Sequence, residues 1–136
     1  MPYAFFETMP SQEALARAVS SISGVPLDEI DVRWRNNLQN VDPSKLFVIQ
    51  GTTTRDAPFH HKIRTGNKRR DVCLPNGDVM SCFEFGPKLA AELGIRVMFD
   101  NDLDEGDSDY LPILVADPDG TIHKAEYREG RVVILD

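Results

Sequence analysis

Apolar residues near the start of the chain follow the spacing of one helical face, with polar residues between them. These residues are Leu15, Ala18, Val19 and Ile22. Ser11 precedes the stripe, and a serine hydroxyl can accept a hydrogen bond from an amide of the first helical turn. Gly24 follows it and suits the left-handed residue that commonly ends a helix. The pattern therefore predicts a surface helix over residues 11–22 with one buried face.

Most other apolar residues form short runs rich in β-branched and aromatic side chains, which are typical of strands. These runs are 3–7, 32–34, 46–50, 59–63, 95–99, 111–116, 121–127 and 131–135. Most connections between them are too short for the crossover that parallel neighbours require. We therefore expect an α+β fold with a mostly antiparallel sheet of about six to eight strands. A chain of 136 residues has the usual size of one domain, so we expect a single domain over 1–136.

Residues 71–85 are predicted to form a further hairpin around Asn76-Gly77, a dipeptide that favours a tight turn. Alternation turns five apolar side chains of this hairpin toward the core, namely Val72, Leu74, Val79, Phe83 and Phe85. A turn centred on Asn76-Gly77 pairs Cys73 with Met80. A slipped turn, centred one residue later, instead places Cys73 opposite Cys82. We favour the first register, with two free thiols.

A second, short helix is predicted over residues 87–93. Pro87 suits the first helical position and Gly94 suits the residue that ends the helix. The expected architecture therefore has one N-terminal helix and one short central helix beside the sheet.

The composition is that of an ordinary globular protein, with 41% hydrophobic residues, 27% charged residues and a formal net charge of -7. No apolar run approaches the roughly 20 residues that cross a bilayer. The first residues lack the basic and apolar regions of a secretory signal. We therefore expect a cytoplasmic protein without membrane contact. The negative charge disfavours nucleic-acid binding, which needs a basic surface, and favours a basic protein partner.

The negative charge is concentrated in the segment Asp100–Asp109, which contains six acidic residues and no basic one. These acids are Asp100, Asp102, Asp104, Glu105, Asp107 and Asp109, and Tyr110 follows them. Residues 1–68 hold 8 Lys+Arg and 7 Asp+Glu (+1), whereas residues 69–136 hold 7 and 15 (-8). Clustered carboxylates can steer a basic protein and pair with its arginines, and a tyrosine can anchor such a contact. We predict a partner-binding surface here; a plain solvated loop is the second interpretation.

A calcium site is a further hypothesis for the same segment. Asp100, Asp102 and Asp104 have the spacing of the first three ligands of an EF-hand loop. The sixth position, however, is Glu105 where glycine is needed, and the twelfth is Leu111 where a bidentate glutamate belongs. A metal-binding structural domain therefore stays an alternative, and we predict no metal site and no cofactor.

A basic stretch opposes the acidic segment, so positive and negative charge are concentrated in different parts of the chain. It consists of His60-His61-Lys62-Ile63-Arg64 and Lys68-Arg69-Arg70. We interpret it as a solvated hairpin end, with phosphate or RNA binding as the alternative. Trp34, flanked by Arg33 and Arg35, is expected to be partly buried, with an exposed stacking platform as the second interpretation.

No catalytic motif is recognisable, so we predict no catalytic residues. Residues 51–55 lack the glycines and lysine of a phosphate-binding loop, and the chain has no GxSxG motif. A small enzyme is nevertheless a possible function. It would combine a cysteine with a histidine, drawn from Cys73, Cys82, His60, His61 and His123.

The expected architecture, with its early helix and the helix-to-strand unit of residues 87–99 followed by Asp100, resembles bacterial immunity proteins of toxin systems. The resemblance covers residues 86–136. It implies a protein that binds a cognate toxin domain, often a nuclease, and blocks its active site. It also implies that the acidic segment makes the contact, through Asp102, Asp104, Asp107 and Asp109.

Overall fold

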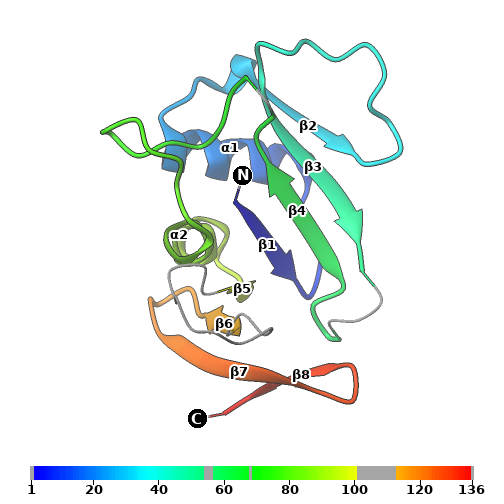
Figure 1. Ribbon diagram of the computed structural model, residues 1–136, viewed down its shortest axis with the longest axis vertical. Coiled ribbons are helices and arrows are strands. Elements are labelled where there is room, and N and C mark those ends of the chain that lie inside the picture. Colours follow the sequence, from blue (N-terminus) through cyan, green and yellow to red (C-terminus); the bar gives the residue numbers. More distant parts are fainter. Residues whose placement is uncertain (1, 54–56, 68, 101–112, 136) are drawn as a thin grey trace.

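The computed structural model describes residues 2–53, 57–67, 69–100 and 113–135 (Figure 1). In these residues eight strands form one sheet, in the order β2-β3-β4-β1-β5-β6-β7-β8. The strands are β1 (Tyr3–Phe6), β2 (Ile30–Trp34), β3 (Leu46–Thr52), β4 (His61–Thr65), β5 (Val97–Asp100), β6 (Ile113–Ala116), β7 (Ile122–Arg128) and β8 (Arg131–Ile134). Only β2 and β3 pair in parallel among the described strands. The fold is therefore α+β with a mostly antiparallel sheet, as predicted.

The helices are α1 (Gln12–Ser23), the single-turn helix η1 (Leu27–Glu29) and α2 (Cys82–Leu93). The prediction of the first helix is confirmed together with both of its ends. The Ser11 hydroxyl accepts a hydrogen bond from the backbone amide of Ala14 at 3.1 Å. Gly24 ends the helix in the left-handed conformation, with φ of 75°. Neither α1 nor α2 is long and apolar enough to cross a membrane, and the same holds for every other helix in the described residues.

The main hydrophobic core lies between the two α-helices and one face of the sheet. Helix residues such as Leu15 and Leu89 pack there against strand residues such as Phe6 and Val48. A smaller core lies on the opposite face, over β1, β5, β6 and β7. Phe59 completes this second core, and the Val132 amide of β8 donates a hydrogen bond to the Ala57 carbonyl at 2.7 Å. Residues 57–59 therefore cover part of the sheet that the helices leave uncovered.

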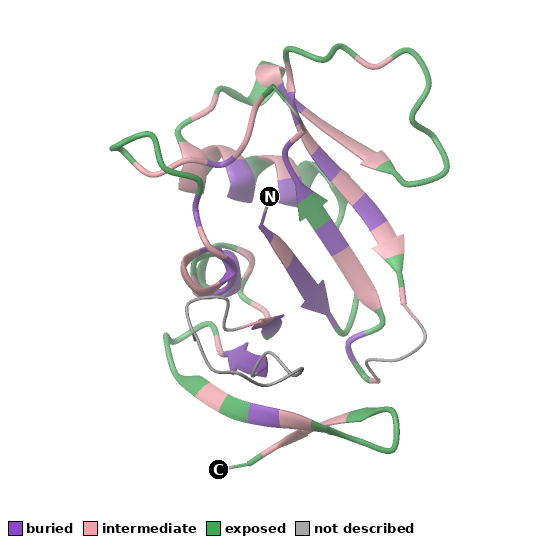
Figure 2. Cartoon of the chain, viewed as in Figure 1, coloured by how far each residue is buried: buried purple, intermediate pink, exposed green. Residues whose placement is uncertain are grey.

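The uncovered face continues over β2, β3 and β4. Along β3 and β4, buried residues alternate with more exposed ones (Figure 2). The buried ones, such as Val48 and Ile63, belong to the main core. Their neighbours Ile49 and Arg64 lie on the other face and stay partly or fully exposed. We call this exposed side of β2, β3 and β4 the open face.

The predicted strand over residues 79–85 is wrong, because α2 already begins at Cys82. The Ser81 hydroxyl accepts a hydrogen bond from the Glu84 amide at 3.2 Å, which is an N-terminal cap. Pro87 lies inside the helix and not at its first position. The end was predicted correctly, since Gly94 closes the helix with φ of 67°.

Because part of this region is a helix and not a strand, the side chains that it buries differ from those predicted. Val72 and Phe85 are buried as predicted, whereas Val79 is 51% exposed. Met80 and Cys82, which the alternation placed on the outer face, belong to the main core. A helix buries residues three and four apart, and Cys82, Phe85 and Leu89 follow that spacing.

The turn at Asn76-Gly77 also differs from the prediction. The Gly77 amide donates a hydrogen bond to the Leu74 carbonyl, so Pro75 and Asn76 occupy the two central positions. Gly77 follows in a left-handed conformation with φ of 92°. Cys73 lies opposite Val79, which is neither of the two expected registers. Cys73 and Cys82 form no disulfide, as predicted.

Candidate functional site

Three cationic side chains meet on the open face. Lys62 and Arg64 are two residues apart on β4, and alternate residues of a strand point to the same face. On the neighbouring strand β3, Gly51 lies opposite Lys62 and Ile49 lies opposite Arg64. Arg35 follows β2 directly, and its amide donates a hydrogen bond to the Gln50 carbonyl at 2.8 Å. The sheet therefore brings together cations from two separate parts of the chain.

These cations line a pocket of about 400 Å³. Its lining residues are Arg35, Leu38, Ile49, Gln50, Gly51, Thr52, Lys62 and Arg64. The lining combines three cations with two aliphatic side chains and one hydroxyl, and it includes no acidic residue. Water screens a concave surface less than a convex one, so charges of one sign in a pocket attract counter-ions over a longer range. The described pocket is therefore suited to an anionic group.

Arg33 and Arg35 have different roles, although they flank the same tryptophan. The Arg33 guanidinium donates from Nε to both carboxylate oxygens of Asp31 at 2.9 Å, and it also contacts the Gln39 carbonyl at 2.5 Å. Arg33 thus holds the chain that follows β2. Arg35 forms no ion pair with any residue in the described ranges, and a Cβ at Gly51 would lie 4.0 Å from its Cδ. The absence of a side chain at Gly51 leaves room over β3 for the Arg35 stem.

Lys62 is positioned by aromatic rings. Its Nζ lies 5.0 Å from the centre of the Tyr3 ring and 5.4 Å from that of the Phe5 ring. An ammonium over a ring face is attracted to it, by about 0.5–1 kcal/mol at an exposed site. These contacts fix the side chain without neutralising its charge. The basic stretch was expected at a hairpin end, but Lys62 and Arg64 lie within β4.

A second pocket, of about 560 Å³, adjoins the first. It is lined by Trp34, Arg35, Asn36, Gln50, Gly51 and Thr52, so four of its residues also line the cationic pocket. Trp34 is 41% exposed and belongs to neither hydrophobic core, so the expected place in the core is wrong. Trp34 pairs with the buried Gln50 and therefore lies on the helix side of the sheet, but it is the last residue of the edge strand β2 and has a neighbouring strand on one side only.

Most of the predicted partner-binding residues fall outside the described part of the chain. These are Asp102, Asp104, Glu105, Asp107, Asp109 and Tyr110. The structure does describe Asp100, at the end of β5, where its carboxylate accepts a hydrogen bond from the Tyr3 hydroxyl. Asp100 therefore joins the acidic segment to the central strand β1. The predicted calcium ligands that follow Asp100 also lie outside the described residues.

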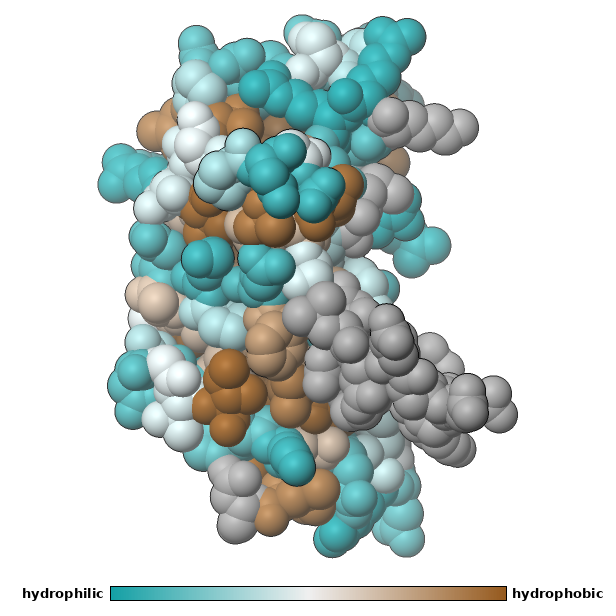
Figure 3. All heavy atoms as spheres, turned by 60° about the vertical axis from the view of Figure 1, so that its left-hand side comes forward, coloured by the Kyte–Doolittle hydropathy of each residue, from teal (hydrophilic) through white to brown (hydrophobic). Residues whose placement is uncertain are grey.

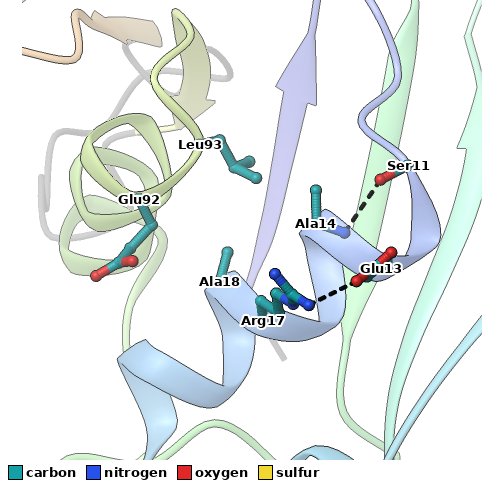
Figure 4. A pocket seen from close by; sticks show the side chains of 7 residues that line it. All are labelled: Ser11, Glu13, Ala14, Arg17, Ala18, Glu92 and Leu93. Carbon is teal, nitrogen blue, oxygen red and sulfur yellow. Dashed lines mark hydrogen bonds and ion pairs between the residues drawn. The ribbon is translucent and has the colours of Figure 1, made fainter.

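A groove between α1 and α2, of about 380 Å³, is another concave surface (Figure 4). Its charged side chains already have partners. The Arg17 guanidinium lies 2.6 Å from the Glu13 carboxylate, and the Ser21 hydroxyl donates to the Glu92 carboxylate at 2.8 Å. On the side of the molecule where α2 lies, hydrophilic side chains divide the apolar ones into separate patches (Figure 3). The charged side chains of this groove are therefore paired within the protein.

A further ionic cluster lies at the turn between β6 and β7. The Asp117 carboxylate contacts His123 Nε2 at 2.7 Å and Arg96 Nε at 3.0 Å. The hydrogen bond with His123, followed by the bond and charge of Arg96, holds the pKa of Asp117 below its ordinary value. The Thr121 amide and hydroxyl lower the pKa of Asp119 in the same turn. These contacts hold the β6–β7 turn together and join it to Arg96, the residue before β5.

Histidine, cysteine and acidic side chains form no metal-binding group in the described ranges, where no three of them lie together. The rings of His60 and His61 differ in their contacts. His60 Nδ1 lies 3.1 Å from the Thr53 carbonyl, whereas His61 Nδ1 is buried without a hydrogen-bond partner. Neither histidine lines one of the described pockets.

The comparisons with known proteins return nothing. The chain matches no family model, no curated protein and no solved structure.

Proposed function

We propose that this chain is a binding protein that holds an anionic group of its ligand in the pocket formed by Arg35, Lys62 and Arg64. One observation carries the proposal: cations that lie far apart in the sequence share one pocket whose described lining has no acid. Ion pairs and hydrogen bonds from arginine and lysine to phosphate or carboxylate are the expected contacts.

Binding is favoured over catalysis by the chemistry of the lining. The pocket contains no cysteine, histidine, aspartate or glutamate among its described lining residues. The only hydroxyl there belongs to Thr52, and no general base lies among the lining residues to activate it. Such a lining can recognise and orient an anion, but it lacks the groups that usually transfer protons.

The immunity-type role is a narrower form of the same proposal. In it, the ligand is a toxin domain, and the acidic segment Asp100–Asp109 supplies a second, oppositely charged contact. The bipolar charge of the chain supports this form, because a partner with complementary charges would be both steered and oriented. Replacing Asp102, Asp104, Asp107 and Asp109 with Asn should then weaken toxin binding and reduce its salt dependence.

Thermal unfolding with defined anions tests the main proposal. Inorganic triphosphate and a short polyglutamate peptide serve as probes for phosphate and carboxylate. A ligand that binds only the folded state stabilises it by about 2.7 kcal/mol at one hundred times its Kd. We expect at least one probe to raise the Tm of the unsubstituted chain, and the K62Q/R64Q double variant to lose most of this rise.

The matched control is a K88Q/R131Q double variant, which removes the same charges from exposed positions on α2 and β8. It should keep the rise in Tm. If neither probe raises the Tm, or if both double variants lose the rise equally, the pocket is not an anion site and the proposal fails.

A further inference from the structure

Three side chains of the second pocket lie on the opposite face of the sheet from Lys62 and Arg64. Trp34 of β2 pairs with Gln50 of β3, and Thr52 follows two residues later on the same strand. Alternate residues of a strand share one face, so these three side chains lie on the side where α1 packs. Lys62 and Arg64 pair with the alternate residues 51 and 49 of β3 and therefore lie on the open face. The second pocket can thus hold a ligand of its own.

The amide of Gln50 gives this pocket a buried donor. Gln50 is 1% exposed, and its Oε1 accepts a hydrogen bond from Gln12 Nε2 at 3.2 Å. Its own Nε2 has no hydrogen-bond acceptor among the described residues. This nitrogen is not sealed in the core, because the one sealed side-chain atom without a partner in the described ranges is Nδ1 of His61. Buried polar groups are nearly always hydrogen-bonded, and an oxygen of a ligand in the pocket would satisfy this donor.

Trp34 supplies an aromatic platform beside this donor. It is 41% exposed, belongs to neither hydrophobic core and makes none of the ring contacts found among the described residues. The face of an indole carries partial negative charge, so it attracts the hydrogens of C–H groups, which carry partial positive charge. A ligand that stacks on the indole also removes its apolar surface from water.

The other groups that line the second pocket are mostly neutral. Asn36 offers an amide and Thr52 offers a hydroxyl, and neither side chain has a hydrogen-bond partner in the described part of the chain. Both groups can donate and accept. Arg35 carries the only charge among the described lining residues. The pocket thus combines one aromatic ring with several neutral donors and acceptors.

We propose that the second pocket binds a neutral sugar, with one face of the sugar ring on the Trp34 indole and a hydroxyl oxygen accepting from Gln50 Nε2. Asn36 and Thr52 would bond further hydroxyl groups of the same ligand. This site is additional to the anion pocket and does not depend on it, since Lys62 and Arg64 line only the first pocket.

A sugar fits this lining better than other small ligands do. A sugar ring presents C–H groups on its faces and hydroxyl groups around its rim, and each hydroxyl can donate and accept. An aliphatic ligand would stack on Trp34 but would cover Gln50 Nε2 without giving it an acceptor, which is unfavourable. An anion would use Arg35 and leave the neutral groups unused. The pocket volume of about 560 Å³ lies within the range of ligand sites, roughly 300–1,000 Å³.

Titration with defined sugars tests the proposal, because Trp34 is the only tryptophan of the chain and its fluorescence reports contact with the indole. The probes are cellobiose, lactose and chitobiose, together with adenosine as a planar ligand and inorganic triphosphate as the ligand of the anion pocket. We expect at least one disaccharide to change the Trp34 emission until it saturates and to raise the Tm. Adenosine should bind more weakly than that disaccharide.

Substitutions at the indole and at the buried donor locate the sugar. W34A should weaken binding of that disaccharide about tenfold or more, whereas W34F should retain part of the affinity. Calorimetry gives these Kd values, because both variants lack the indole. Q50M keeps the length of the side chain but removes the donor, and it should weaken binding as well. The Tm of each variant shows whether it folds, and if Q50M does not, T52V tests a second polar contact.

Two control variants change the first pocket alone. L38A removes an exposed apolar side chain that lines only that pocket, and K62Q/R64Q removes its cations. Both should leave the Kd of the disaccharide unchanged. An equal loss of sugar binding in L38A and W34A would overturn the proposal.

The remaining outcomes distinguish the sugar site from the anion site. If no disaccharide binds, if W34A binds it as tightly as the unsubstituted chain, or if adenosine binds more tightly than every disaccharide, the sugar proposal fails. Triphosphate binding that is lost in K62Q/R64Q would then still support the anion site. If a disaccharide binds through Trp34 and no anion binds, the sugar site stands and the anion site fails.

Discussion

Gly86 on α2 lies directly against the ring of Phe99 on β5. A Cβ added to Gly86 would lie 2.5 Å from Cγ and Cδ1 of that ring, closer than real side chains approach. The absence of a side chain thus sets how closely α2 packs on the sheet. Both residues are fully or almost fully buried, so neither can move aside into solvent.

Replacing Gly86 with Ala should therefore destabilise the fold. Alanine favours a helix over glycine by about 1 kcal/mol, but overpacking a buried contact costs about 1–3 kcal/mol, and both sides of this contact are fixed. We expect a net loss of free energy of unfolding in chemical denaturation. The G86A/F99L double variant is the control: it should lose less than the sum of the single variants, and strict additivity would show that the two residues do not interact.

The turn between β7 and β8 offers a stabilising substitution. Glu129 and Gly130 both have positive φ, at 52° and 79°, and Glu129 has a side chain that disfavours this conformation. The E129N variant should gain about 0.5–1 kcal/mol, because asparagine tolerates the left-handed region and Asn-Gly suits a two-residue hairpin turn. E129A removes the same charge but keeps the conformational penalty. An equal gain from E129A would point to charge as the cause.

An amide pair, with Gln50 buried and Gln12 exposed, connects the sheet to α1. Gln50 is 1% exposed, and its side-chain oxygen accepts a hydrogen bond from Gln12 Nε2 at 3.2 Å. The same Gln12 group lies 3.2 Å from the Val32 carbonyl. The Q12A variant should lose about 1–3 kcal/mol, since a buried acceptor then lacks its donor. The Q12L/Q50L double variant should recover part of this loss, because it leaves no unpaired amide. If the double variant is less stable than Q12A, the loss in Q12A does not come from the broken amide pair.

Stability at acid pH should depend on Asp117. Its pKa in the folded state lies below its ordinary value, chiefly because of the hydrogen bond with His123, so the folded state favours the charged carboxylate. The contribution to stability is then present above the unfolded pKa of 3.8 and is lost as the pH falls through the folded pKa.

The D117N variant should therefore melt below the unsubstituted chain at neutral pH, and the difference should shrink as the pH falls below about 4. Thermal unfolding from neutral to strongly acid pH measures it. A difference of the same size at every pH would mean that the asparagine changes the packing of the turn, and that the charge of Asp117 does not contribute.

The structure was predicted correctly where neighbouring residues in the sequence all indicated the same element. The stripe beginning at Leu15, with Ser11 before it and Gly24 after it, predicted α1 to within one residue at its C-terminal end. The runs 111–116 and 121–127 predicted two strands, which are β6 and β7, and in the short turn between them the Gly120 amide donates to the Asp117 carbonyl at 3.0 Å. In both cases the determining contacts lie within a few residues.

The start of α2 was missed although a local signal existed. Ser81 and Glu84 form a serine-x-x-glutamate pair, which is the signature of a helix N-terminus. Pro87 obscured it, because proline is far more common at the first helical position than inside a helix. The periodicity of Cys82, Phe85 and Leu89 also matched a helix.

The candidate site could not be assembled from the sequence. Lys62, Arg64 and Arg35 each stood out, but their meeting depends on β3 lying between β2 and β4. The parallel pairing of β2 with β3 is needed as well, since it brings Trp34 beside Gln50. No pattern within either segment specifies that pairing, which arises from the packing of the whole sheet.

The position of β1 has a consequence for synthesis. β1 is made before every other described strand, yet it lies between β4 and β5 and pairs with both. A ribosome must therefore release the chain past Asp100 before Tyr3–Phe6 can gain its second neighbour, and until then its apolar residues lack most of their partners. Contacts this distant slow folding. We therefore expect chaperones to bind the nascent chain until most of its residues have left the ribosome.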